Sequence, residues 1–248
     1  MKVLQILPQL NIGGVERGTL DLSKALIHKG HESFVISGGG ILVDELEQLG
    51  AKHYEIPVHI KSLKTLSLAK SLSETISSID PDIVHIRSRM PAWVNYRAFK
   101  MLQKKPLLVS TFHGLYSFPI YSKVMSFVDH SIAISKTVEN YILENYKLDK
   151  NDITVIPRGC DPVEFNNHEI NPDDKAEIIN EFPQIVGKTV LTIPGRITKW
   201  KGVAEFIELF SLLDDNYHGL IVGPTAKSKK KYLNKLQNKI RKMFQHFP

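Results

Sequence analysis

Short apolar runs alternate along the chain with longer stretches whose apolar positions recur at the helical period. The runs that predict strands are 3–7, 33–36, 83–86, 107–111, 131–134 and 154–156, and the first stretches that predict helices are 15–28, 42–49 and 92–102. This alternation is typical of a parallel sheet with crossover helices and predicts an α/β fold. The carboxyl ends of such strands meet at one edge of the sheet, where open sheets of this kind bind ligands.

The pattern loosens over residues 166–187 and then begins again. Strands are expected at 190–193 and 220–222, and helices at 203–213 and 230–243. We therefore expect two Rossmann-like lobes, with an N-terminal domain over residues 1–165, a linker over 166–187 and a C-terminal domain over 188–248. The last part has about 60 residues, fewer than the roughly 100 to 150 of a common domain, so the second lobe is expected to be incomplete.

The composition, 42% hydrophobic and 23% charged residues in 248, is that of an ordinary globular protein. Because Cys160 is the only cysteine and no Cys or His pairs have zinc-ligand spacing, a reducing compartment, the cytoplasm, is expected. The apolar start at residues 3–7 is shorter than a signal-peptide core of about 7 to 15 residues. No stretch approaches the roughly 20 apolar residues that span a bilayer, so any contact with the inner face of the cytoplasmic membrane is expected to be peripheral.

The formal net charge is +6, which favours anionic partners. Many of the basic residues cluster in the expected C-terminal helix, between 227 and 242. A solvated helix face is the simplest explanation, and peripheral contact with an anionic membrane is a second one. No helix-turn-helix, zinc or aromatic-stacking module accompanies the charge, so nucleic acid is not expected as a partner.

Two glycines, Gly13 and Gly14, stand between the first expected strand and the first expected helix. Glycine lets a backbone come close to a ligand, and a helix N-terminus offers free N–H groups to an anion. The signal is weak by itself, because the spacing to Gly18 does not match the Gly-x-Gly-x-x-Gly fingerprint and no P-loop lysine follows. A tight turn without a ligand would explain the same residues.

A second loop of this kind follows the strand at 190–193. It places Arg196 and Lys201 at the carboxyl end of a strand and before a helix, as a metal-free diphosphate clamp would. The pattern Gly195-Arg196-x-x-x-x-Lys201-Gly202, paired with the Gly13-Gly14 loop, resembles the family 4 glycosyltransferases. Further family-like segments lie at 13–18, 81–85, 110–114, 132–135 and 155–161, in matching order and spacing.

The resemblance implies the B-type fold, in which two Rossmann-like lobes close over a nucleotide-diphosphate sugar. It implies transfer of the sugar, with retention, to a glycan or lipid-linked acceptor, with no metal or other cofactor. The N-terminal domain would then lie on the acceptor side, and the C-terminal domain would bind the nucleotide sugar. Within the family the sequence is most similar to bacterial enzymes that build lipopolysaccharide or other surface glycans.

Carried over residue by residue, the resemblance assigns Arg196 and Lys201 to the donor diphosphate. It assigns the Gly13-Gly14 loop to the donor phosphate and the acceptor side, and His113 to the active site. A lone histidine usually has a structural explanation, but His113 stands in a Phe-His-Gly turn just past a strand. In retaining transfer of this type the leaving diphosphate itself accepts the acceptor's proton, so the protein mainly stabilises charge.

Two arginines and two aspartates are further candidates for a functional role. Arg87 and Arg89 follow the strand at 83–86 and are candidate acceptor-binding residues for an anionic group, with surface charge as the alternative. Asp80 and Asp82 have the Asp-x-Asp spacing of a metal site, but they precede their strand and are interpreted as a turn.

The chain departs from the family pattern after Val222. Family members carry two glutamates, seven residues apart, that hold the donor sugar and ribose, and none follow here. Three hypotheses stay open: a sugar-transferring enzyme, an inactive remnant or partner-dependent subunit that self-associates or recruits a missing lobe, and a nicotinamide-dependent oxidoreductase. The third lacks the glycine fingerprint, and glycines 38–40 stand where a ribose-binding acid is expected.

Overall fold

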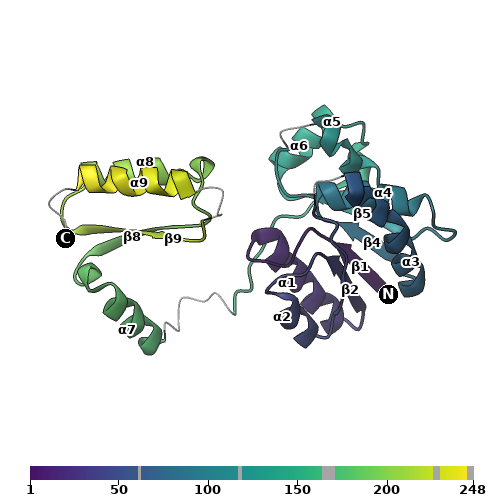
Figure 1. The fold of residues 1–248 in the computed structure, drawn as a ribbon, viewed down its shortest axis with the longest axis horizontal. Helices are drawn as coiled ribbons and strands as arrows, with labels where there is room; N and C mark the ends of the chain where they lie inside the picture. Colours follow the sequence, from purple (N-terminus) through teal and green to yellow (C-terminus); the bar gives the residue numbers. More distant parts are fainter. Residues whose placement is uncertain (61–62, 117–118, 164–170, 226–229, 245–248) are drawn as a thin grey trace. The chain divides into compact units, whose positions relative to one another are not determined.

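The computed structural model describes residues 1–60, 63–116, 119–163, 171–225 and 230–244 (Figure 1). It divides into two compact units, Met1–Cys160 and Asp161–Pro248, which are described separately below as unit 1 and unit 2. Across this described part of the chain, no helix combines the length and apolar character needed to cross a membrane.

Unit 1 is built on a parallel sheet of seven strands in the order β3-β2-β1-β4-β5-β6-β7. The strands are β1 Lys2–Ile6, β2 Glu32–Ser37, β3 Lys52–Glu55, β4 Ile83–Ile86, β5 Leu107–Phe112, β6 His130–Ala133 and β7 Ile153–Val155. The strand order reverses between β1 and β4, and doubly wound sheets bind ligands at the carboxyl ends of the strands where such a reversal occurs. The predicted α/β fold with a parallel sheet is confirmed.

Helices cover both faces of this sheet. They are α1 Gly14–His28, α2 Val43–Gln48, α3 Ala69–Ile79, α4 Arg89–Phe99, α5 Pro119–Ser122 and α6 Lys136–Asn145, with 3-10 turns η1 Leu63–Leu68, η2 Lys123–Ser126 and η3 Lys150–Asp152. In Figure 1, α1 and α2 lie on one side of the strands, and α3 and α4 lie on the other. The strand β3 and the helix α3 were not among the predicted elements; β3 is a short edge strand with a charged residue at each end, which gives little apolar signal.

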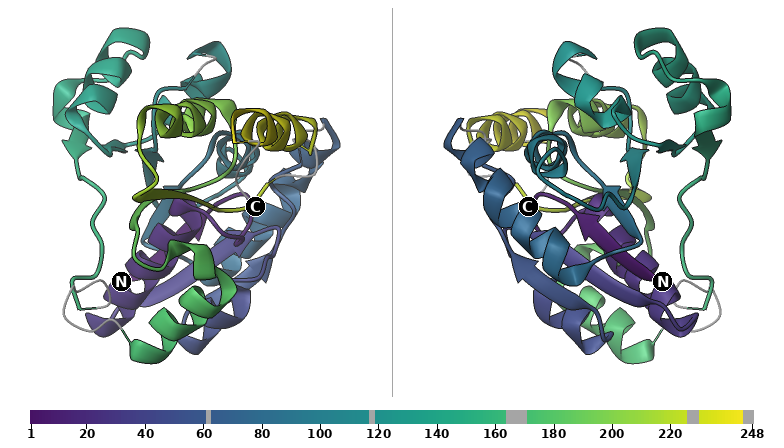
Figure 2. Two further views of the ribbon diagram at one scale, coloured as in Figure 1. Left: turned by 90° about the vertical axis from the view of Figure 1, so that its left-hand side faces the viewer. Right: turned by 90° about the vertical axis from the view of Figure 1, so that its right-hand side faces the viewer.

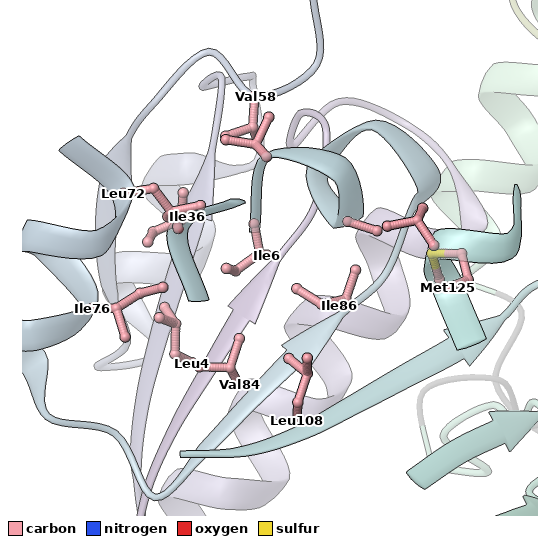
Figure 3. Close-up of a cluster of buried hydrophobic side chains, with 14 of the residues drawn as sticks. Leu4, Ile6, Ile36, Val58, Leu72, Ile76, Val84, Ile86, Leu108 and Met125 are labelled. Carbon is pink, nitrogen blue, oxygen red and sulfur yellow. The ribbon is translucent and has the colours of Figure 1, made fainter. Parts of the chain in front are cut away.

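The two faces of β1 serve different purposes. Leu4 and Ile6 are fully buried on the face covered by α3, where they pack with Ile36 and Leu72 (Figure 3). Because successive strand residues point to opposite faces, Gln5 faces α1 instead. Its amide donates to Thr19 O at 3.2 Å and to Ser23 Oγ at 3.0 Å, so it is held in one orientation. That orientation matters for the site described below.

Unit 2 has two parallel strands, β8 Thr189–Pro194 and β9 Tyr217–Val222. Its helices are α7 Pro172–Glu181, α8 Val203–Leu209 and α9 Lys230–Met243, with 3-10 turns η4 Pro183–Ile185, η5 Lys199–Lys201 and η6 Phe210–Leu212. Figures 1 and 2 show α8 and α9 side by side on one face of the strands. The small core between these layers has Val203, Ile207 and Leu236 at its centre.

The observed boundaries differ in detail from the predicted ones. Unit 1 ends at Cys160, five residues before the predicted end of the N-terminal domain at 165. The predicted linker, 166–187, contains α7 and η4, while residues 164–170 lie outside the described residues. The helix predicted at 203–213 ends at Leu209 and continues as a 3-10 turn, and the strand predicted at 220–222 begins at Tyr217.

Candidate functional site

The turn between β1 and α1 leaves Gly14 open to its surroundings. Gly13 is the N-cap of α1 in an extended conformation (φ 173°), and its carbonyl accepts a hydrogen bond from the Arg17 N–H at 2.9 Å. A side chain at Gly14 would meet no other atom of the protein within 4 Å. Packing within the chain therefore does not require a glycine at position 14. The first turn of a helix has free N–H groups that can bind an anion, and the Glu16 carboxylate lies against Gly13 at this turn.

The second glycine cluster, residues 38–40, supports this turn from the neighbouring strand. The Leu10 N–H donates to Gly39 O at 2.8 Å, and a Cβ at Gly40, where φ is 143°, would collide with the backbone of Leu10. The glycines thus let the loop after β2 hold the loop after β1. In the sequence these glycines argue only against a ribose-binding acid, and the contact between the two loops was not predicted.

His113 directly follows β5, at the carboxyl edge of the sheet. Its Nε2 atom is enclosed and has no hydrogen-bond partner in the described part of the chain. Burial lowers the pKa of His113 to about 3, and the positive charges of Arg87 and Arg158 lower it further in the same direction. The imidazole is therefore neutral at physiological pH.

Arg87 directly follows β4 and is a buried cation, with an exposed fraction of 5%. Its Nη1 donates to Gln5 Oε1 at 2.9 Å, while its Nε has no partner among the described residues. Burial lowers the pKa of Arg87 to about 10, helped by the charge of Arg158 and opposed by Asp21 and Glu16. At neutral pH the guanidinium stays charged, so this part of the site carries a positive charge with little solvent around it.

His85, on β4, is also neutral, and its contacts within the sheet are structural. It is buried, and its Nε2 atom shares a hydrogen bond of 2.7 Å with Thr111 Oγ1 on the neighbouring strand β5. Burial, and then the charge of Arg87, holds its pKa well below the usual value. It links the two strands that carry Arg87 and His113.

Arg158 was not predicted as a site residue. It lies just after β7, and its guanidinium donates a hydrogen bond to the Gly14 carbonyl and rests against Gly18. The signal was present in the sequence, because Arg158 follows a strand in the same way as Arg87 and His113 do. The family-like segment at 155–161 contains this arginine, and the resemblance assigns it no role.

Arg89 and Arg87 lie in different surroundings, although both were predicted to meet an anionic acceptor. Arg89 begins α4, and its guanidinium lies 4.8 Å from the ring centre of Tyr116 and 5.5 Å from that of Tyr121. Its Nη1 atom donates to Ser122 Oγ at 3.4 Å. These contacts tie the segment after β5 to α4, and a role for Arg89 in acceptor binding stays a prediction.

The Asp-x-Asp pair lies at the amino edge of the sheet, between α3 and β4. Asp80 caps α3 in a left-handed conformation (φ 48°) and pairs with Lys104 at 2.7 Å. Asp82 accepts a hydrogen bond of 2.7 Å from the Lys2 backbone. Both carboxylates serve the chain's own turns, as the sequence indicated.

In unit 2, the loop after β8 is held close to the end of β9. Gly195, where φ is 140°, donates its N–H to Val222 O at 2.8 Å. Arg196 is exposed, and the Lys201 ammonium lies 4.6 Å from the ring centre of Trp200. Within the described ranges neither Arg196 nor Lys201 forms an ion pair.

The predicted residues thus fall into two groups. Unit 1 brings together Gly14, Arg87 and His113 and adds Arg158, while Arg196 and Lys201 share one loop of unit 2. Each unit is described by itself, so the prediction that all of them border one cleft stays a prediction.

Comparison with known proteins identifies the class to which this arrangement belongs. The model of the family described as Glycosyltransferase Family 4 matches residues 12–164. Among solved structures, a glycosyltransferase of Rickettsia africae is 32% identical with a TM-score of 0.79, over 98% of this chain and 64% of that one. Anabaena HepE, solved with UDP and glucose, is 18% identical with a TM-score of 0.82, over 99% of this chain and 67% of that one. The fold is therefore that of the B-type glycosyltransferases.

The family match spans more than half of the chain, and the chain belongs to glycosyltransferase family 4. An uncharacterised glycosyltransferase of Methanocaldococcus jannaschii is 33% identical over 150 residues, which make up 53% of this chain and 36% of that protein. WaaG, described as a glycosyltransferase involved in lipopolysaccharide biosynthesis, is 15% identical with a TM-score of 0.70, over 97% of this chain and 68% of that one. The chain thus spans less than two thirds of the archaeal and the rickettsial relative. Nothing in the family match supports the oxidoreductase hypothesis.

Proposed function

We propose that the protein transfers a sugar, with retention, from a nucleotide-diphosphate sugar to a glycan or lipid-linked acceptor, in the synthesis of lipopolysaccharide or another surface polysaccharide. The observation that carries this proposal is the neutral, enclosed His113 directly after β5, in a chain of family 4. A nucleotide-sugar donor is supported by the fold shared with HepE, which was solved with UDP and with UDP-glucose. A role in lipopolysaccharide synthesis is supported by the fold shared with WaaG.

The low pKa of His113 favours stabilisation of charge over proton abstraction. A base with a pKa of about 3 is a poor proton acceptor at neutral pH, whereas a neutral imidazole can still form hydrogen bonds with a sugar. In the proposed step, the bond between the anomeric carbon and the diphosphate oxygen breaks. The acceptor oxygen bonds to the same face of that carbon, and its proton passes to the leaving diphosphate.

Charge then grows on the diphosphate, and exposed cations on a preorganised loop would stabilise it. Arg196 and Lys201 are the proposed donors, because both extend from the loop that Gly195 holds against β9. A cytoplasmic location with peripheral membrane contact would suit a lipid-linked acceptor, and the basic helix α9 offers charges for that contact.

The test is release of nucleoside diphosphate from a panel of nucleotide sugars by the purified chain, with lipid-linked and free glycan acceptors. Arg196→Ala and Lys201→Ala are each expected to lower kcat/KM by about 10² to 10³, the usual effect of losing one donor to a developing negative charge. Lys199→Ala is the matched control, because Lys199 is an exposed lysine of the same turn, and it should retain activity. Equal losses in all three variants would contradict the assigned roles.

A second candidate is a partner-dependent or inactive subunit, and the surface of unit 2 favours it. Leu212 is 82% exposed and Val222 is 51% exposed, beside a sheet of two strands. Such apolar surface suits self-association or a further protein segment. Nucleotide-sugar binding without turnover by the chain alone, restored by a partner fraction, would favour this candidate over the first.

A further inference from the structure

A short turn after β5 carries His113, and Tyr116 closes this turn. The Tyr116 hydroxyl accepts a hydrogen bond of 3.4 Å from the His113 backbone N–H. The Tyr116 ring also packs on Phe112, the last residue of β5, with 5.5 Å between the ring centres. Because Phe112 is fully buried, it offers the Tyr116 ring a fixed surface. Tyr116 thus contacts both residues at the junction of strand and turn.

Helix α6 holds the other end of this turn. The hydroxyl of Tyr141, on α6, donates a hydrogen bond to the Tyr116 carbonyl oxygen. Tyr146, directly after α6, is buried, and its ring centre lies 5.5 Å from that of Phe112 and 5.9 Å from that of Tyr141. Aromatic rings at such distances attract one another beyond the effect of the area that they bury. The turn is therefore fastened at both ends, at the His113 N–H and at the Tyr116 carbonyl.

Helix α4 reaches the turn through Arg89, whose guanidinium lies against the rings of Tyr116 and Tyr121. Tyr121 is fixed on α4, because its carbonyl oxygen accepts a hydrogen bond of 3.0 Å from the Trp93 indole. Within the described ranges Arg89 forms no ion pair with a carboxylate, so the two rings and a serine hydroxyl stabilise its charge. Arg89 thus joins a ring anchored on α4 to the ring that packs at the His113 turn.

The residues between the two ends of the turn have few contacts of their own. A Cβ at Gly114 would meet no atom within 4 Å, and Leu115 is 60% exposed. Packing of these intervening residues therefore does little to fix the position of His113. The His113 side chain is nevertheless enclosed, since its Nε2 atom is buried. Its enclosure consequently depends on the contacts that Tyr116 makes.

We propose that Tyr116 is a positioning residue for His113, and that Arg89 acts through Tyr116 by holding its ring. The hydroxyl of Tyr116 fixes the backbone of His113, and the position of that backbone decides whether the imidazole is enclosed. Arg89 then serves the site without contact with an acceptor. The importance of this positioning for sugar transfer rests on the proposed function, whereas the enclosure of His113 is a property of unit 1 alone.

The experiment follows the protonation of His113 by NMR of the full chain with isotope-labelled histidine, between about pH 8 and pH 4.5. The His113 signal is assigned by its loss in His113→Gln. In the original chain His113 should stay neutral throughout, because its pKa is about 3. Tyr116→Phe removes the hydroxyl and keeps the ring, so the turn should open and let water solvate the imidazolium. The pKa of His113 should then rise to about 4 to 5, while Arg87 and Arg158 still oppose its protonation.

A second variant tests the part of Arg89. Arg89→Lys keeps the positive charge but loses the planar group that lies on the two tyrosine rings. It should raise the pKa of His113 by a smaller amount, since the Tyr116 hydroxyl remains. Tyr96→Phe and Arg97→Lys are the matched controls, because they make the same chemical changes about two turns further along α4. In both controls His113 should stay neutral over the same pH range.

Sugar transfer gives a separate measurement. Tyr116→Phe should lower kcat about tenfold and leave KM for the nucleotide sugar unchanged, because a displaced His113 no longer meets the transition state. Thermal unfolding checks that each variant is folded, and Arg89→Lys carries the test if Tyr116→Phe does not fold.

The outcomes separate the positioning role from the proposed function. If His113 keeps the same pKa in Tyr116→Phe and in Arg89→Lys, or if Tyr96→Phe changes it equally, the positioning role is wrong, whether or not the chain transfers sugar. A raised pKa of His113 in a chain without transfer activity would sustain the positioning role and contradict the proposed function. A raised pKa with an unchanged kcat would show that the position of His113 does not serve catalysis.

Discussion

The two units use the same local pattern of strand, helix and strand, yet they bury it to very different degrees. In unit 1, Leu4 and Ile6 of the inner strand β1 are fully buried, and helices cover both faces of the sheet. In unit 2, every residue of β8 and β9 is exposed or only partly buried. Helices α8 and α9 cover one face of these strands, and Ile193 and Ile221 of the strands pack only partly buried against the small core.

This difference shows that local pattern and burial are separate properties. A parallel strand becomes fully buried only when it has strands on both sides and helices on both faces. Strand β1 has both, since β2 and β4 flank it, whereas β8 and β9 have one neighbour each. Stability and a rigid site are therefore expected mainly from unit 1.

The largest expected effect comes from removing a core leucine in each unit. Leu4→Ala should destabilise unit 1 by about 3 to 5 kcal/mol, because the tightly packed sheet cannot close the cavity. Leu236→Ala should cost unit 2 about 2 kcal/mol, since its smaller core can relax around the lost atoms. Hydrogen exchange of peptides from each unit, followed across a urea series, measures both values. Equal losses would show that unit 2 is packed as well as unit 1.

The next largest expected effect is a dependence of stability on pH in unit 1, caused by His113. Unfolded His113 takes up a proton near pH 6.5, but folded His113 does so only near pH 3, so unit 1 loses stability as the pH falls through this window. His113→Gln should reduce the slope of the free energy of unfolding against pH by at most about 1.4 kcal/mol per pH unit. Unit 2 should be unaffected. Urea midpoints at pH 7, 6 and 5 measure the slope, and an unchanged slope in unit 1 would mean that His113 is not held neutral.

The smallest expected effect compares two glycines with opposite roles. Gly202 links η5 to α8 in a left-handed conformation (φ 74°), so Gly202→Ala should destabilise unit 2 by about 1 to 2 kcal/mol. Gly18 lies inside α1, and Gly18→Ala should stabilise unit 1 by up to about 1 kcal/mol through helix propensity. Thermal unfolding measures both. A loss of stability at Gly18 would show that the contact with Arg158 contributes to folding.

The sequence by itself determined the alternation of strands and helices and the parallel sheet, because the spacing of apolar residues within each segment reflects the secondary structure of that segment. It also located His113, Arg87 and Arg196 at the carboxyl ends of strands, since strand direction follows from the crossover pattern. It did not predict β3, because this short edge strand has a charged residue at each end and little apolar signal. It also did not predict the support that Gly40 gives to the loop after β1.

Only the tertiary structure decided how these residues meet. It buried Arg87 against Gln5 and placed Arg158, more than 140 positions away from Gly14, on the start of α1. It also separated Arg89 from Arg87 by stacking the former on two tyrosines. The physical reason is that charge, burial and hydrogen-bond partners depend on which strands and helices become neighbours. The spacing of apolar residues within one segment predicts that segment's secondary structure, but it does not predict the order of strands in the sheet.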